Sequence, residues 1–290
     1  MKKTIMIQGT ASGVGKSTIA LGLCRLFRQA GFRVAPFKVL NCSHAAHTLP
    51  DGGQMARSQA LQAMACGIAP CADQNPVLVK PSGNSELIIG GSPVGFALDF
   101  EPAHLRQIMA QAADAAYCRL QSNYDILVAE GAGSPVELNL KEDEFVNMGF
   151  AKRYGADVIL VADVNRGGVF ASVYGTMQLL APAERELVKG IVINQFCGDP
   201  AQFSDAIPIL EKLAQKPVLG VVPKMELAVE DEDMTFDKGP VKTRQSLSAG
   251  MDEEQYQQHL DREFNKLAGV LRRCLDLRAL DLRAVSTAYD

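Results

Sequence analysis

Short runs of aliphatic residues alternate with helical patterns along most of this chain. The runs lack the polar residue at every second position that marks a strand with one face in water. Parallel strands buried on both faces produce such runs, and the helices between them supply the crossover connections. With 290 residues, of which 47% are hydrophobic, the chain can bury a core of this size. The sequence therefore predicts an α/β fold, a doubly wound and mostly parallel sheet with helices on both faces.

The predicted elements follow from the apolar periodicity and from the turn residues that end each run. Strands are expected at residues 4–8, 33–40, 125–130, 157–163, 189–195 and 218–222, with a hairpin at 86–99. Helices are expected at residues 16–30, 54–66, 102–121, 143–154, 170–180 and 203–215.

Beyond residue 223 the pattern changes, which predicts a division of the chain into three parts. Residues 1–224 form the α/β domain, and residues 225–250 have the composition of an acidic and polar linker. Its run Glu230-Asp231-Glu232-Asp233 is expected to be a solvated surface. Residues 251–290 carry an amphipathic helix, which we expect to pack back on its own domain; the alternative is a helix that binds a partner. Its apolar positions are Tyr256, Leu260, Phe264, Leu267, Leu271 and Leu275.

Charge and cysteine content argue against several classes of function. The 29 Lys and Arg against 33 Asp and Glu give a formal net charge of −4, so neither a nucleic acid nor a membrane is an expected partner. No apolar run approaches the roughly 18 residues that cross a bilayer, and the run after Met1-Lys2-Lys3 is broken at Gln8-Gly9, too early for an export signal. We expect a cytoplasmic protein whose seven cysteines are reduced and mostly buried. Neither the cysteines nor the four histidines have the spacing of a metal site.

The sharpest motif is Gly-Thr-Ala-Ser-Gly-Val-Gly-Lys-Ser-Thr at residues 9–18, between the first predicted strand and the first predicted helix. Its glycines let backbone N–H groups turn toward an anion, and the helix N-terminus adds positive potential. Lys16 can neutralise phosphate charge, and Ser17 offers a hydroxyl to Mg²⁺. The usual motif has four residues between its first glycine and the Gly-Lys pair, whereas Gly9 leaves five. The loop predicts a nucleotide site formed by Thr10, Ser12, Gly13, Val14, Gly15, Lys16, Ser17 and Thr18.

Polar side chains also stand where other predicted strands end. Glu130 is placed to ligate Mg²⁺ beside the loop, or else to cap the glycine turn that follows it. Lys38 could face the phosphates or be an ordinary surface lysine, and Asp163 ends the strand at 157–163. Arg166 could grip a phosphate or carboxylate, or form a surface ion pair. Asn194 could read adenine or cap a loop.

The loop also indicates a branch of the phosphate-loop proteins. Partitioning ATPases and nitrogenase iron proteins carry a further lysine early in the loop, where this chain has Ala11. The Gly9-Thr10 opening, together with Pro36-Phe37-Lys38, resembles instead the dethiobiotin synthetase group. That resemblance implies a second lysine, Lys38, facing the phosphates from across the loop.

Six longer motifs follow the loop in order along the chain. They are Ala35-Pro36-Phe37-Lys38, Asp51-Gly52-Gly53, Asn75-Pro76-Val77-Leu78-Val79-Lys80-Pro81, Glu130-Gly131-Ala132-Gly133-Ser134-Pro135, Val146-Asn147-Met148-Gly149 and Arg166-Gly167-Gly168-Val169-Phe170-Ala171-Ser172. With the loop, they resemble the synthetase domain of the cobyric acid synthase family over nearly all of residues 3–223. Several long motifs in sequence are more specific than one loop.

Members of that family amidate peripheral carboxylates of a corrinoid, adenosylcobyrinic acid a,c-diamide, with ATP, Mg²⁺ and ammonia released from glutamine. The resemblance implies that each carboxylate is phosphorylated and then attacked by ammonia. The resemblance implies a corrinoid substrate, with ammonia taken either free or from a separate glutaminase subunit. A second copy of the chain is the other partner considered. The implied residues are Lys16, Lys38, Glu130 and Asp163 for catalysis, Ser17 and Glu130 for magnesium, Asn194 for the nucleotide, and Asn41, Arg166 and Gly167 for the substrate.

The chain also departs from the family. The family's glutaminase domain carries a nucleophilic cysteine in a Gly-x-Cys-x-Gly turn, and none of the seven cysteines has that setting. The segment after the linker resembles the family's extreme C-terminus. Val39-Leu40-Asn41-Cys42 replaces an expected Ala-Gln-Asn-Met, Gln54 an expected Glu, and Asn165 an expected Asp. Two alternatives to a ligase of this type therefore stay open: a corrinoid-binding or regulatory ATPase without ligase turnover, and a carboxylating enzyme like dethiobiotin synthetase.

Overall fold

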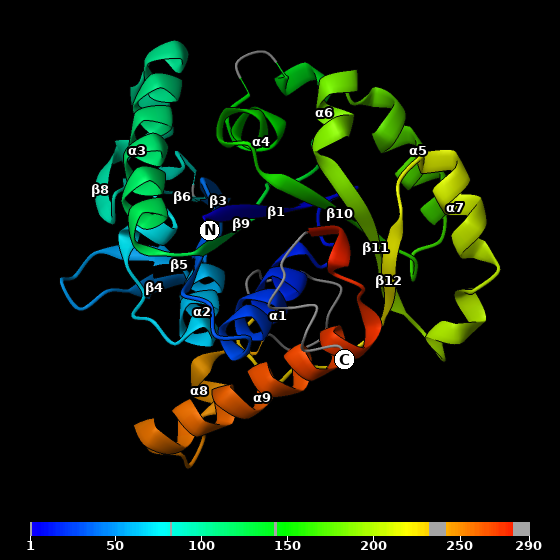
Figure 1. The fold of residues 1–290 in the computed structure, drawn as a ribbon. Coiled ribbons are helices and arrows are strands. Elements are labelled where there is room, and N and C mark those ends of the chain that lie inside the picture. The colour runs from blue at the N-terminus through cyan, green and yellow to red at the C-terminus, as the bar shows by residue number, and fades with distance from the viewer. Residues whose placement is uncertain (1, 82, 142–143, 232–241, 281–290) are drawn as a thin grey trace.

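The computed structural model describes residues 2–81, 83–141, 144–231 and 242–280, and a parallel sheet lies at its centre (Figure 1). The strand order is β12-β11-β10-β1-β9-β2, and each neighbouring pair runs parallel. These strands are β1 (Lys3–Gly9), β2 (Val34–Phe37), β9 (Ile126–Glu130), β10 (Asp157–Asp163), β11 (Val188–Phe196) and β12 (Val218–Pro223). Every residue of β9 is buried, so the sheet must be covered on both faces. The predicted doubly wound sheet is confirmed.

Two layers of helices cover the sheet, and each strand sends alternate side chains into two separate cores. Ile5 and Ile7 of β1 pack with the first helix layer, whereas Met6 packs with the second. Figure 1 shows α1 and α9 on one side of the sheet and α4 and α5 on the other. The first layer holds α1 (Lys16–Gln29), α2 (Arg57–Cys66) and α9 (Glu253–Cys274). The second holds α3 (Pro102–Asn123), α4 (Met148–Tyr154), α5 (Val169–Leu179), α6 (Pro182–Leu187) and α7 (Ala206–Ala214).

A further sheet, of strand order β3-β6-β7-β8, lies beside α3 (Figure 1). Its strands are β3 (Leu40–Cys42), β6 (Val77–Lys80), β7 (Glu86–Ile89) and β8 (Ser92–Phe96). β7 and β8 pair antiparallel and form the predicted hairpin. The expected single strand at 33–40 is divided, because the Asn75 amide donates to the carbonyl of Lys38 at 3.1 Å and turns the chain away from β2 toward β6.

The helix expected at 54–66 begins three residues later than predicted. Residues 54–56 form β5 (Gln54–Ala56), which pairs antiparallel with β4 (Ala46–Thr48), and α2 starts at Arg57. Residues 54–56 therefore pair with β4 as a strand, although their sequence pattern predicts that they belong to the helix. The start of the helix expected at 143–154 is also late, because α4 begins at Met148.

The amphipathic helix packs back on the domain as α9, as expected. Its apolar positions are buried in the core that α1 shares. The two helices approach so closely that a Cβ on Gly22 of α1 would lie 2.4 Å from Leu271. Arg25 of α1 donates to Asn265 at 2.8 Å and pairs with Asp261 at 3.0 Å.

The segment before α9 is partly buried, contrary to expectation. The Glu230 carboxylate, 8% exposed, lies 2.9 Å from the Arg57 guanidinium and accepts a hydrogen bond from the Tyr256 hydroxyl. Burial, and then the charge of Glu230, raise the pKa of Tyr256. The prediction of a solvated acidic run is therefore wrong at Glu230, while Glu232 and Asp233 lie outside the described residues. A short helix, α8 (Arg244–Leu247), also occurs in the expected linker.

In the described ranges, no helix combines the length and the apolar character needed to span a membrane. All seven cysteines fall within those ranges, and none of them forms a disulfide there. The expectation of mostly buried thiols is wrong. Only Cys24 and Cys66 are buried, whereas Cys42, Cys71, Cys118 and Cys197 are exposed.

Candidate nucleotide-binding and active site

The phosphate loop joins β1 to α1 at the carboxyl edge of the sheet. Gly13 and Gly15 have φ of +74° and +94°, a backbone conformation that glycine adopts without steric cost. A Cβ on Gly15 would lie 2.1 Å from the Asn194 amide nitrogen, so no larger residue fits there. The Thr10 N–H donates to the carbonyl of Val161 at 3.0 Å, which ties the start of the loop to β10. The loop at 11–13 is exposed, and α1 begins at Lys16.

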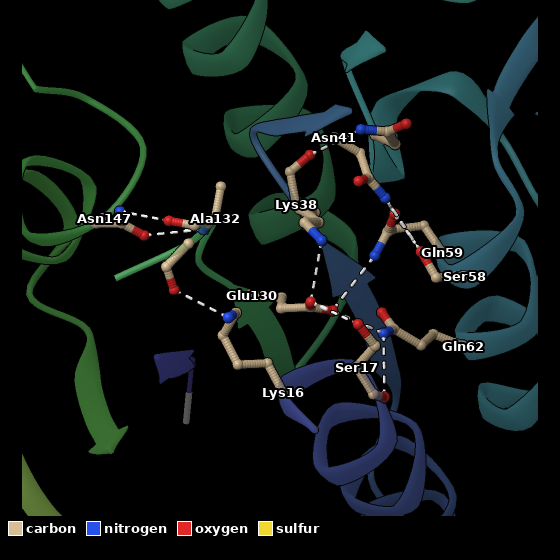
Figure 2. Close-up of polar contacts among 12 residues, drawn as sticks. Lys16, Ser17, Lys38, Asn41, Ser58, Gln59, Gln62, Glu130, Ala132 and Asn147 are labelled. Atoms are coloured by element: carbon tan, nitrogen blue, oxygen red, sulfur yellow. Dashed lines mark hydrogen bonds and ion pairs between the residues drawn. The ribbon is translucent and has the colours of Figure 1, made fainter. Parts of the chain in front are cut away.

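The Lys16 ammonium lies across this loop and is 7% exposed. Its Nζ donates to the carbonyls of Ala11 and Gly133, each at 2.9 Å. Figure 2 shows Lys16 directed toward the turn that contains Ala132. Lys16 thus joins the phosphate loop to the glycine turn that follows β9. A lysine at this place, the first residue of α1 beside the loop, is positioned to neutralise phosphate charge.

Glu130 is the centre of the site and is 1% exposed. Its Oε1 accepts hydrogen bonds from Ser17 Oγ at 2.7 Å and from Lys38 Nζ at 3.0 Å. Figure 2 shows these groups converging from α1, from the segment after β2 and from the end of β9. The structure therefore brings together Lys16, Ser17, Lys38 and Glu130, which are separated by up to 114 positions in the sequence. Lys38 is 6% exposed, so the alternative of an ordinary surface lysine does not hold.

Two glutamines of α2 complete the surroundings of Glu130. Gln62 Nε2 donates to Glu130 Oε2 at 3.0 Å, and Gln59 Nε2 lies 3.4 Å from the same oxygen. The apolar pattern at 54–66 predicts a helix here, but neither glutamine was a predicted site residue. The available signal was two glutamines three positions apart, which face the same side of a helix whose other residues are mostly small and apolar.

Asn41, an expected substrate contact, lies behind Gln59 and is 4% exposed. Its Nδ2 donates to Gln59 Oε1 at 2.9 Å and to Ser58 Oγ at 3.1 Å. Asn41 thus acts on the site through Gln59 in this arrangement, and its contact with substrate stays a prediction.

Asn147 belongs to the Val146–Gly149 motif and was not a predicted site residue. In the structure its side chain contacts the backbone of Ala132. Its Nδ2 donates to the carbonyl of Ala132 at 2.8 Å, and its Oδ1 accepts from the Ala132 N–H at 2.9 Å. A Cβ on Gly131 would lie 2.3 Å from that Oδ1. Asn147 therefore holds the glycine turn whose Gly133 carbonyl receives Lys16.

Asp163 and Arg166 lie on the other side of the loop. Asp163 Oδ1 accepts from the Asn165 N–H at 2.7 Å, and Asp163 Oδ2 lies 3.5 Å from Arg166 Nε. The Arg166 side chain is 66% exposed, and its guanidinium comes within 3.5 Å of where a Cβ on Gly13 would stand. The surface ion pair is thus present, and Arg166 also lies within reach of the loop. Gly167, with φ of +78°, is exposed beside it.

Asn194 has the loop-capping arrangement. Its Nδ2 donates to the carbonyl of Val14 at 2.9 Å, and the residue is 3% exposed. The amide thereby holds the loop from the end of β11. A contact with adenine stays a prediction.

Two cobyric acid synthases are similar to this chain in sequence. The cobyric acid synthase of Dehalococcoides mccartyi is 46% identical over 239 residues, which cover 81% of this chain and 47% of that protein. The cobyric acid synthase of Moorella thermoacetica is 45% identical over 255 residues, covering 86% of this chain and 49% of that protein. The chain therefore spans about half the length of these relatives, and the resemblance inferred from its motifs is confirmed.

Among solved structures, the signal recognition particle receptor FtsY from Elizabethkingia anophelis in complex with GDP superposes with a TM-score of 0.43 at 16% identity. The superposition covers 77% of this chain and 57% of that one. The family model described as "CobQ/CobB/MinD/ParA nucleotide binding domain" matches residues 5–235, most of the chain. The chain belongs to this family of nucleotide-binding domains.

Proposed function

We propose that this chain is an ATP-dependent, amide-forming ligase of the cobyric acid synthase type, which acts on side-chain carboxylates of a corrinoid. The observation that carries the proposal is the contact of Ser17 and the buried Lys38 with the buried Glu130, beside Lys16. Identity of 45–46% to two cobyric acid synthases supports the corrinoid as substrate. Because the chain spans half of those proteins, the complete activity is part of the proposal.

In this mechanism the loop and Lys16 hold the phosphates of ATP. Backbone N–H groups at 13–17 and the N-terminus of α1 face the phosphate oxygens. Lys16 Nζ exchanges a carbonyl contact for phosphate, and its charge balances the charge that develops during transfer. Lys38 adds a second positive charge from the opposite side of the site.

The residues present fit Mg²⁺. Ser17 Oγ and Glu130 Oε1 are 2.7 Å apart, and hydroxyl and carboxylate oxygens are ligands that magnesium prefers. Ser17 and Glu130 would hold the ion. When bound, Mg²⁺ supplies positive charge to the phosphate oxygens.

The proposed reaction has two steps. A carboxylate oxygen of the corrinoid attacks the γ-phosphorus, the bond to the β-phosphate oxygen breaks, and ADP leaves. Ammonia then attacks the acyl carbon of the acyl phosphate and loses a proton, and inorganic phosphate leaves. Lys16 and Lys38 face the negative charge in both steps.

The direct test is ATP turnover with ammonium and a panel of corrinoid carboxylates, with mass spectrometry of the products. The proposal expects ADP formation that depends on both substrates and a product lighter by the mass difference between a carboxylic acid and its amide. ATP hydrolysis that no corrinoid stimulates, with no amide formed, would contradict it.

One observation favours a second candidate, a corrinoid-binding or regulatory ATPase without ligase turnover. Two positions expected to carry a carboxylate hold amides instead. Gln54 lies in β5, and the Asn165 side chain accepts a hydrogen bond from Cys197 Sγ at 3.1 Å rather than offering a charge. The same turnover assay separates the two candidates.

Glu130→Gln is expected to weaken the dependence of turnover on Mg²⁺ while the fold persists. The change is nearly isosteric and removes a charge, so the apparent affinity for the metal should fall about 10-fold or more. A magnesium titration of ATP hydrolysis measures this effect. If Glu130 serves only to cap its turn, the unfolding temperature falls instead and the titration is unchanged.

Ammonium, rather than glutamine, is expected to be the nitrogen source for this chain by itself. No cysteine has the nucleophile-turn setting, and burial raises the pKa of Cys24, Cys71 and Cys274, which disfavours the reactive thiolate. Of the other four cysteines, Cys42 is the one close to a histidine in sequence, two positions from His44, which makes it the candidate nucleophile. Glutamate release from glutamine by the isolated protein, abolished in Cys42→Ala, would overturn this expectation and the proposed separate glutaminase subunit.

A further inference from the structure

Gln62 has one satisfied end and one unsatisfied end. Its Nε2 donates to Glu130 Oε2 at 3.0 Å and lies 3.5 Å from the carbonyl of Ser17. The residue is 1% exposed. Within the described part of the chain, its Oε1 is buried and has no hydrogen-bond partner. Buried acceptors of this kind are uncommon in folded proteins, because leaving water without a replacement partner costs free energy.

The neighbouring carboxylate determines which way this amide points. Rotating the amide by half a turn would place Oε1 against Glu130 Oε2, and two acceptors without a hydrogen between them repel. Donation by Nε2 to Glu130 is therefore the stable orientation, and it leaves Oε1 without a partner. The unsatisfied oxygen is a consequence of how Gln62 holds Glu130.

A second glutamine, in strand β1 of the central sheet, provides a comparison. Gln8, at the end of β1, is also 1% exposed and also has an unpartnered Oε1. Its side chain contacts the sulfur of Met6, which packs against the second helix layer. Glu130 lies two positions after Val128, which packs against the first helix layer, so the Glu130 side chain is on that face of the sheet. Gln8 therefore projects from the opposite face of the sheet. Gln62 alone of the two contacts the candidate metal ligands.

We propose that Gln62 is a positioning residue of the magnesium site, holding Glu130 through Nε2 and accepting a hydrogen bond through Oε1 from a water molecule on the ion. This inference rests on the proposed function. The amide oxygen lies in a group that also has a hydroxyl, Ser17, and a carboxylate, Glu130, all of them oxygen donors suited to magnesium. Magnesium usually keeps several of its waters, which need such acceptors. A neutral amide provides a hydrogen-bond acceptor for such a water without adding negative charge beside a triphosphate.

The test measures Mn²⁺ affinity by electron paramagnetic resonance, with a non-hydrolysable ATP analogue bound and without turnover. Gln62→Leu is expected to weaken Mn²⁺ binding about 10- to 100-fold, the usual cost of removing a group that supports metal ligands. Gln62→Glu retains an oxygen and loses the donor to Glu130, so it should bind Mn²⁺ more weakly than the unaltered protein but more tightly than Gln62→Leu. Gln8→Leu, the matched control, should bind Mn²⁺ normally. Circular dichroism of each variant establishes that it is folded.

The outcomes separate the two proposals. If the unaltered protein with the analogue does not bind Mn²⁺, the proposed function fails. If it binds Mn²⁺ and Gln62→Leu binds equally well, only the role of Gln62 fails. If Gln62→Glu loses affinity as Gln62→Leu does, Gln62 acts solely as a donor to Glu130, and the water contact is overturned.

Discussion

Lys16→Ala should reduce ATP turnover about 100- to 1,000-fold, the usual effect of removing one charge-stabilising donor from a site shielded from water. Lys16 is buried, and its Nζ donates to the carbonyls of Ala11 and Gly133, so it lies between the phosphate loop and the glycine turn after β9. Lys38 does not replace it, because Lys38 Nζ contacts Glu130 Oε1 at 3.0 Å. Steady-state ADP release measures the loss.

Lys212→Ala is the matched control for that variant. Lys212 is an exposed lysine on α7, so its loss changes the net charge equally without touching the loop. Its turnover should equal that of the unaltered protein. Normal turnover in Lys16→Ala, or an equal loss in Lys212→Ala, would contradict the nucleotide assignment.

Phe264→Ala should lower the free energy of unfolding by about 3–5 kcal/mol, the range for deleting a buried aromatic side chain. Phe264 is fully buried between α9 and the core that α1 shares. Chemical denaturation followed by circular dichroism measures the change. Gln257→Ala, on the exposed side of the same helix, should shift stability by less than about 0.5 kcal/mol. Equal values for the two would show that α9 does not stabilise the domain.

The strands of the central sheet could be predicted because each is a short run buried on both faces. β10 occupies the predicted residues, Asp157–Asp163, without any change. The errors occur where tertiary contacts override local pattern. Asn75, distant in sequence, turns the chain after Lys38, and pairing with β4 takes residues 54–56 out of the expected helix.

Part of the candidate site could be predicted from the sequence, because the carboxyl ends of parallel strands lie at the same edge of the sheet. Lys16, Lys38 and Glu130 each follow a strand and meet there, as expected. Gln59 and Gln62 were not predicted, because they come from the middle of a helix and their importance depends on which residue α2 faces. Asn147 was missed for a similar reason: its amide binds a turn 15 positions earlier in the chain.

The contact between α1 and α9 has a consequence for how the protein is made. Arg25 and Asn265, which join these helices, are separated by 240 positions. A ribosome that adds about 5–20 residues per second needs about 10–50 s to pass from the first helix to the last. During that interval the apolar side of α1, the helix that begins with the phosphate-loop lysine, has no α9 to cover it. This face of the domain can therefore close only after α9 has been synthesised, and until then the nascent chain exposes an apolar surface that chaperones are suited to shield.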